Sequence, residues 1–174
     1  MANLVDDIRQ LREETSCGVI ECKKALEESK GDFKKAKDVL RKRGLELAAK
    51  KAGRVATEGR VEAYIHTGNK MGVVVEVNCE TDFVARNEDF INFTRDVAMH
   101  IAAVAPKYIK KEDVPADVLE NQPDKEAFLK ANCLMLQGFV KDPSKTIGDY
   151  LNELVAKIGE NIQINRFSRF KIGE

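Results

Sequence analysis

The 174-residue chain has no tryptophan, only two histidines, no surplus of charge of either sign and no long apolar run. Its 29 basic residues balance 29 acidic ones, which argues against a protein that mainly coats nucleic acid or an acidic membrane. No apolar stretch approaches the roughly 18 residues of a membrane-spanning helix. The start, "MANLVDDIRQ", lacks the apolar core of a signal peptide and is too acidic for a transit peptide. We therefore expect a cytoplasmic protein, or one already processed after import into an organelle.

Signatures of enzymes and metal sites are also missing. There is no Gly-rich phosphate loop, no Gly-x-Ser-x-Gly elbow and no carboxylate pair beside a base. His100 lies at the edge of an apolar helical face and is expected to be a packed core residue, whereas His66 ends a strand and is expected to be exposed. No Cys-x-x-Cys pair occurs, so we expect four reduced, mostly buried thiols. These are Cys17, Cys22, Cys79 and Cys133. We expect no enzymatic activity, no cofactor and no metal.

The first 52 residues predict three short helices that form a small bundle, because apolar residues recur at helical spacing in each. The residues expected to cap or end these helices are Asn3, Thr15, Ser16, Gly31, Asp32 and Gly44. A basic stretch follows from Arg41 to Arg54. We expect it to form a short connector helix, which is either a solvated link or a surface that steers the chain toward an acidic partner.

From Arg60 the apolar period changes from helical spacing to two. "RVEAYIH" and "MGVVVEVN" predict two strands, and Gly68-Asn69 between them predicts a hairpin turn. A helix is expected to begin near Glu88, with Asn87 as its cap.

The rest of the chain predicts a connecting region, a helix and a strand. All four prolines fall between Pro106 and Pro143, so we expect a connecting region over about 106–143, with one amphipathic helix that includes Phe128 and Met135. "TIGDYLNELVAKIGE" predicts a long helix and "NIQINRFSRFKI" a final strand. The order of these elements indicates an α+β protein whose antiparallel sheet packs with helices.

The segment "VNCETDFVARNEDF" raises a specific question, because it places an aspartate and a large aromatic at the joint between a strand and a helix. Judged from the residues alone, Phe83 would more readily pack back against Phe90 as a hydrophobic staple, with Asp82 an ordinary turn residue. The other interpretation is that both side chains face outward to meet a partner.

Several segments together resemble elongation factor Ts, the family of nucleotide-exchange factors for the GTPase elongation factor Tu. They are "TSCGVIECKKALEESKGDFKKAKDVLRKRG", "AAKKAGRVATEG", "VEVNCETDFVARN", "AMHIAA" and "GFVKDPSKTIGDYL", with "RFSRFKIGE" at the end. The resemblance implies a three-helix domain over 1–52, similar to ubiquitin-associated (UBA) domains, that docks on the GTPase. It also implies a core and dimerisation domain over 53–174. The implied function is guanine-nucleotide exchange that promotes GDP release during translation elongation.

The resemblance also assigns residues. In the family, the Asp-Phe pair of a Thr-Asp-Phe-Val motif enters between helices of the GTPase near its magnesium site. In the N-terminal domain, two apolar residues and a lysine contact the partner. The matching residues here are Thr81, Asp82, Phe83 and Val84 in the core, Val19, Ile20 and Lys23 in the N-terminal domain, and, as a possible further contact, His66.

The chain departs from the family pattern in three ways. Many members carry methionines where Val19 and Ile20 stand, and these stiffer β-branched side chains suit a smaller or differently tuned contact. Longer members carry two copies of the core module, whereas this chain has room for one copy. Short members of this kind work as symmetric dimers, so the resemblance implies a homodimer. A disulfide known among short members would need a cysteine where Ser168 stands, so the dimer is expected to be noncovalent there. The alternative function is a non-enzymatic adaptor that binds helical or ubiquitin-like partners.

Overall fold

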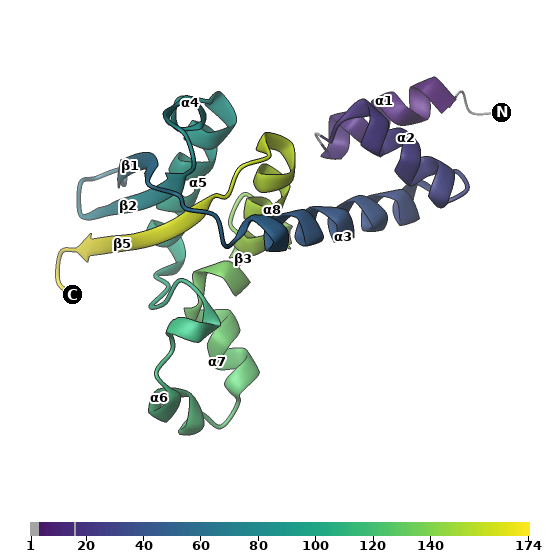
Figure 1. Ribbon diagram of the computed structural model, residues 1–174. Helices are drawn as coiled ribbons and strands as arrows, with labels where there is room; N and C mark the ends of the chain where they lie inside the picture. Colours follow the sequence, from purple (N-terminus) through teal and green to yellow (C-terminus); the bar gives the residue numbers. More distant parts are fainter. Residues whose placement is uncertain (1–3, 16) are drawn as a thin grey trace. The chain divides into compact units, whose positions relative to one another are not determined.

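The computed structural model describes residues 4–15 and 17–174, so the predicted roles of Asn3 and Ser16 lie outside the described residues. Helices and antiparallel strands both occur, which confirms the predicted α+β class (Figure 1). The chain forms two compact units. The first comprises the part up to Arg54 together with Asn152–Asn161, and the second comprises Val55–Leu151 together with Ile162–Glu174. Over the described residues, every helix is too short or too polar to cross a membrane.

The first unit is built on a three-helix bundle of α1 (Leu4–Thr15), α2 (Val19–Glu28) and α3 (Phe33–Lys51). Each helix contributes apolar side chains to one small core, including Leu11, Leu26 and Leu40. The carboxylate of Asp32 accepts a hydrogen bond from the backbone N–H of Lys35 at 3.0 Å, which confirms the predicted cap of α3.

The third helix is longer than predicted, and the prediction of a separate connector helix is wrong. α3 does not end at Gly44 but continues to Lys51, so most of the basic stretch lies on α3 itself. Gly44 is buried, and a β-carbon there would lie 3.6 Å from the Cβ of Ala156. A glycine inside a helix costs about 1 kcal/mol relative to alanine, a penalty that the strong helix formers after Gly44 and packing against the 152–161 segment offset.

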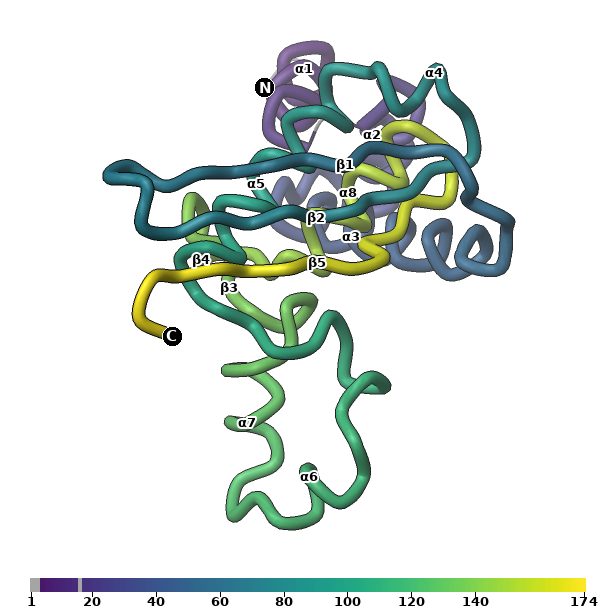
Figure 2. The backbone as a smooth tube through the Cα atoms, turned by 90° about the vertical axis from the view of Figure 1, so that its left-hand side faces the viewer, coloured from purple at the N-terminus to yellow at the C-terminus, as the bar shows by residue number. Residues whose placement is uncertain are grey.

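The second unit is organised by a three-stranded antiparallel sheet in the order β1-β2-β5 (Figure 2). Its strands are β1 (Glu58–Ile65), β2 (Met71–Cys79) and β5 (Gln163–Lys171). Gly68 and Asn69 both have positive φ, at 91° and 56°, which confirms the predicted hairpin turn between β1 and β2. In this hairpin Ile65 pairs with Gly72 at one end, and Glu58 pairs with Cys79 at the other.

One face of the sheet packs against α5 (Glu88–Val104), whose first turn is capped by Asn87 as predicted. Alternate residues of β2 on that face, Val73, Val75 and Val77, are fully or almost fully buried. The residues that alternate with them along β2 point to the opposite face of the sheet, because successive side chains of a strand point to opposite sides. The sheet therefore has one face buried beneath α5 and one face with exposed side chains.

The predicted connecting region is an excursion with short elements of its own. These are η1 (Lys111–Asp113), α6 (Ala116–Glu120), α7 (Lys125–Asn132), η2 (Leu134–Leu136), β3 (Gly138–Phe139) and β4 (Asp142–Thr146), followed by α8 (Ile147–Ile158). The helix predicted to reach Met135 ends earlier, because the chain turns at Cys133 to form backbone hydrogen bonds. The carbonyl of Asn132 accepts hydrogen bonds from the N–H groups of Lys107 and Tyr108, and Leu134 donates to Tyr108. These bonds close the base of the excursion.

His100 lies in the core of the second unit, as predicted. It is fully buried in α5, and Nε2 lies 3.1 Å from the side-chain oxygen of Gln137. Its Nδ1 accepts a hydrogen bond from the N–H of Val140 at 3.4 Å. Burial lowers the pKa of His100 below its ordinary value of 6.5, and the hydrogen bond to Gln137 only partly offsets this effect. His100 is therefore a neutral core residue that ties α5 to the segment around β3.

Candidate partner-binding site

The corner between the sheet and α5 is a one-turn helix, α4 (Asp82–Ala85). The hydroxyl oxygen of Thr81 caps this turn by accepting a hydrogen bond from the N–H of Val84 at 3.4 Å. The buried thiol of Cys79 donates to the carbonyl oxygen of Thr81 at 3.1 Å. The end of β2 and the cap of α4 therefore hold the Thr-Asp-Phe-Val stretch in a defined conformation.

The aromatic side chain at this corner faces solvent. Phe83 is 80% exposed, whereas Phe90 is fully buried in the layer between α5 and the sheet. The interpretation of Phe83 as a staple on Phe90 is therefore wrong, because the turn of α4 directs the two rings to different environments. Beside Phe83, the carboxylate of Asp82 forms an exposed ion pair with Arg86 at 2.9 Å. The corner thus presents an apolar ring next to a carboxylate.

The first unit presents a second exposed apolar pair on the first turn of α2. Val19 is 52% exposed and Ile20 is 68% exposed, while Cys22, Ala25 and Leu26 of the same helix are buried. Lys23, one turn further along, is exposed, and its Nζ forms an ion pair with Oε1 of Glu27 at 3.8 Å. The predicted contact residues of the N-terminal domain therefore share the solvent side of one helix.

His66 lies just beyond β1 at the turn of the hairpin and is exposed, as predicted. Its backbone N–H donates to the carbonyl of Met71 at 2.9 Å, and its carbonyl accepts from Asn69 at 2.9 Å. Its Nδ1 lies 3.0 Å from the hydroxyl oxygen of Tyr64. Both the backbone and the ring of His66 are thus held by neighbours in the same hairpin.

The predicted residues form separate groups rather than one pocket. Thr81 to Val84 share one turn at the Cys79 end of the hairpin, and His66 lies at the opposite end. The eight residue steps along the nine-residue β2, at roughly 3.2 Å each, separate these ends by about 25 Å. Val19, Ile20 and Lys23 belong to the other unit.

Sequence reasoning missed the exposed face of the sheet as a candidate surface. It carries large apolar side chains that are 42–76% exposed, namely Val61, Ile65, Val74, Phe170 and Ile172. β2 reads as a nearly continuous apolar run, "MGVVVEV", rather than as a strict alternation, and that run is the signal for a strand with apolar side chains on both faces. We call these five residues the outer sheet patch.

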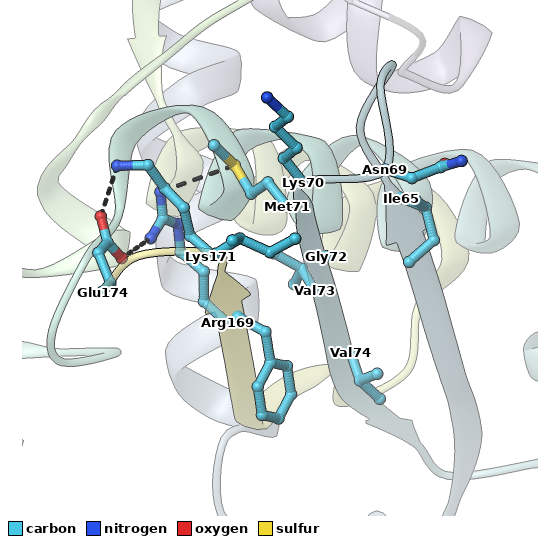
Figure 3. Close-up of a pocket in the computed structure, with 12 residues that line it drawn as sticks. Ile65, Asn69, Lys70, Met71, Gly72, Val73, Val74, Arg169, Lys171 and Glu174 are labelled. Atoms are coloured by element: carbon cyan, nitrogen blue, oxygen red, sulfur yellow. Dashed lines mark hydrogen bonds and ion pairs between the residues drawn. The ribbon is translucent and has the colours of Figure 1, made fainter.

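Charged groups lie near both ends of the sheet. A cavity of about 580 Å³ lies at the hairpin end, where Arg169 and Lys171 both reach Glu174, at 2.6 and 2.7 Å (Figure 3). At the other end Glu76 accepts hydrogen bonds from Asn165 and Arg166, which lower the pKa of its carboxyl. The ion pair of Glu76 with Arg166 therefore borders the outer sheet patch, because Glu76 pairs with Val61. Arg169 instead pairs with Val73 and donates from Nε to the carbonyl of Ala102 in α5, so it lies on the opposite face.

Within the described part of the chain, no three His, Cys, Asp or Glu side chains gather as metal ligands. All four cysteines lie in this part, and none forms a disulfide. Burial raises the pKa of the Cys22 and Cys133 thiols, so both remain protonated at neutral pH. What the molecule presents to its surroundings is a set of protruding apolar residues on ordered turns. Exposed apolar side chains on ordered turns are typical of the class of proteins that act by binding other proteins.

Comparison with known proteins identifies the family. A family profile described as Elongation factor TS matches residues 1–126 and 124–174. Elongation factor Ts of Caldanaerobacter subterraneus subsp. tengcongensis is 51% identical, over 96% of this chain and 95% of its own length. Elongation factor Ts of Geotalea daltonii is 50% identical, over 100% of this chain and 91% of its own length. The chain belongs to the elongation factor Ts family, whose name places it among proteins of translation elongation.

Proposed function

We propose that this protein is a cytoplasmic guanine-nucleotide exchange factor that binds the GTPase elongation factor Tu and promotes GDP release. The observation that carries this proposal is Phe83, which is 80% exposed on a capped turn and so leaves most of its ring open to solvent. A ring held in this way suits insertion between elements of another protein. The activity is not enzymatic in the usual sense, because the factor forms and breaks no covalent bond.

The energetic task is a coupling between two binding sites. A GTPase that holds GDP at nanomolar affinity has about 12 kcal/mol of binding free energy to overcome. Much of this comes from Mg²⁺ and from backbone N–H groups around the phosphates. The factor must bind the nucleotide-free GTPase more tightly than the loaded form, and GDP then weakens the factor by the same ratio. Weakening GDP by about 10⁴-fold requires about 5.5 kcal/mol of coupling.

Phe83 and Asp82 can supply part of this coupling. A phenylalanine side chain contributes about 1.5–3 kcal/mol when it becomes fully buried, and insertion into a packed helix pair shifts whatever those helices hold. The neighbouring carboxylate suits the N-terminal end of a partner helix or repulsion of a phosphate. The exposed pair Val19 and Ile20, with Lys23, adds binding energy from the first unit, because the corner alone falls short of the required coupling.

The outer sheet patch supports a noncovalent homodimer as the assembled form. Contiguous exposed apolar side chains with a polar rim are typical of an interface between proteins. Ser168, the residue where a linking cysteine would stand, is exposed on β5 and pairs across the ladder with Val74 of this patch. In the proposed dimer, two such faces pack together, and each copy keeps its own corner available for a GTPase.

The experiment that tests the function is release of a fluorescent GDP analogue from elongation factor Tu of the same source. Micromolar amounts of this chain are expected to accelerate release, and no acceleration would reject the proposal. Sedimentation of the chain alone and with nucleotide-free GTPase then measures the self-association state and the stoichiometry of the complex. A monomer at micromolar concentration would reject the dimer without affecting the exchange activity.

A further inference from the structure

We propose that Tyr64 is a positioning residue, which holds the ring of His66 so that its Nε2–H is presented as a hydrogen-bond donor to the GTPase. The inference rests on the proposed exchange function and concerns the hairpin end, about 25 Å from Phe83. The two side chains touch in the free protein: the hydroxyl oxygen of Tyr64 lies 3.0 Å from Nδ1 of His66, and the ring centroids are 6.1 Å apart.

The hairpin restricts the freedom of both residues. Residues two apart lie on the same side of a strand, so Tyr64 and the residue just beyond β1 point the same way. Tyr64 is half-buried and pairs across the ladder with Val73, which is buried beneath α5. The two backbone hydrogen bonds of His66 fix its main chain at the turn. Rotation of the imidazole is the remaining freedom, and the bond to Tyr64 removes it.

The chemistry of the two groups sets the direction of this hydrogen bond. An unprotonated imidazole nitrogen is a stronger acceptor than a phenol oxygen, and a phenol O–H is a good donor. Tyr64 therefore donates to Nδ1, and in a neutral imidazole the proton then resides on Nε2. Because the His66 side chain is exposed, Nε2–H is available to a neighbouring molecule. The matching group on the GTPase is an acceptor, either a backbone carbonyl oxygen or a carboxylate.

Holding the ring before the encounter increases affinity without any new contact. A side chain that must be ordered on binding weakens the complex, and removal of that cost corresponds to roughly a three- to tenfold gain in affinity. The same ring left free to rotate would populate both tautomers and several orientations. We therefore expect the effect of Tyr64 to pass through His66 and to disappear when His66 is replaced.

The first arm of the test uses exchange kinetics on the full chain. Tyr64→Phe is expected to raise the half-saturating concentration of the factor three- to tenfold, with little change in the maximal rate of GDP release. In a His66→Ala background, Tyr64→Phe should cause no further loss. Tyr108→Phe, which removes the hydroxyl of another half-buried tyrosine in the same unit, is the matched control and should be silent. An unchanged Tyr64→Phe, or a full additional loss in the His66→Ala background, would overturn the inference.

Substitution of His66 separates the two ring nitrogens. A glutamine places its amide nitrogen near the position of Nε2, whereas an asparagine places it near Nδ1. We expect His66→Gln to retain more activity than His66→Asn, and the reverse order would contradict a donor at Nε2.

The second arm needs no GTPase. The ¹⁵N chemical shifts of the ring nitrogens in the neutral imidazole report the tautomer, and the Nε2–H form should dominate in the wild type and become mixed in Tyr64→Phe. A wild-type protein in the Nδ1–H form would overturn the inference. If the wild-type factor released no GDP, the proposed function would fall and, with it, the contact of His66. Failure of Tyr64→Phe alone, with an active wild type, would remove only the role assigned to Tyr64.

Discussion

Replacement of Phe83 by alanine should abolish much of the exchange activity and leave the fold intact. A buried phenylalanine removes about 150–250 Å² from water, and Phe83 still exposes 80% of its surface in the free chain. Insertion into a partner would therefore bury roughly 120–200 Å², worth about 3–5 kcal/mol gross at about 25 cal/mol per Å². Ordering and imperfect packing reduce this to about 1.5–3 kcal/mol, which corresponds to roughly a 10- to 150-fold loss of exchange efficiency.

The chain offers a matched control seven residues away. Phe90→Ala makes the same chemical change at a ring that is fully buried between α5 and the sheet. It should lower the free energy of unfolding by about 3–5 kcal/mol, because it removes core contacts and leaves a cavity. Phe83→Ala should change the same quantity by no more than about 0.5 kcal/mol, since the ring has few contacts to lose.

Two measurements decide the outcome: the efficiency of GDP release by each variant, and its free energy of unfolding from chemical denaturation. If the corner is an insertion site, Phe83→Ala loses exchange activity and keeps its full stability. If this variant exchanged GDP at the wild-type rate, the corner would not be an insertion site. If it were destabilised as much as Phe90→Ala, the ring would have a structural role in its own unit, and the exposure argument would be wrong.

Three further predictions test stability and assembly. Gly44→Ala should stabilise the first unit by about 0.5–1 kcal/mol, because the added methyl group would lie in ordinary contact, 3.6 Å from the Cβ of Ala156. Gly59→Ala should destabilise the protein, because φ is 150° there and the methyl group would clash with the Val77 carbonyl; thermal melting compares the two variants. The free energy of unfolding should fall as pH drops below about 6.5, because His100 then binds a proton in the unfolded chain but resists protonation where it is buried. Chemical denaturation at pH 7.5 and 5.5 measures this loss of stability, which should be smaller in His100→Gln. Ser168→Cys should form disulfide-linked dimers under oxidation. Lys171→Cys should not, because this exposed residue of β5 points to the other face of the sheet. Equal cross-linking of the two variants would contradict the proposed interface.

Local signals in the sequence predicted the structure correctly where it depends on neighbouring residues and not on distant contacts. Asp32 and Asn87 cap helices as their side chains suggest, and Gly68-Asn69 forms the hairpin turn, because each depends only on neighbouring backbone. Gly44 misled the prediction, since a glycine that ends an isolated helix is tolerated inside one that packs closely. The early end of α7 depends on hydrogen bonds to Tyr108, 24 residues before Asn132, which no local pattern announces.

The candidate site was harder to predict for a physical reason. The spacing between Phe83 and Phe90 fits both a staple and an outward corner, and only the turn of α4 distinguishes the two. The roles of Val19, Ile20 and Lys23 came from the family resemblance, because an apolar residue on the first turn of a helix reads equally well as core. The outer sheet patch was missed because a strand with apolar side chains on both faces resembles one that is buried on both sides.

The arrangement of the exposed groups has a consequence for how exchange would work. A coupling of about 5.5 kcal/mol exceeds what one phenylalanine can supply, so several contacts must favour the nucleotide-free GTPase together. Phe83 and His66 lie at opposite ends of one hydrogen-bonded hairpin, backed by the buried layer of α5, and such a packed layer does not stretch to follow its partner. A GTPase that contacts both ends must therefore adapt to a separation fixed by β2. Because the sheet is rigid, two modest contacts at its ends would together restrict the conformation of the partner. A substitution that weakens the pairing of β1 with β2 should therefore reduce exchange even when Phe83 and His66 are unchanged.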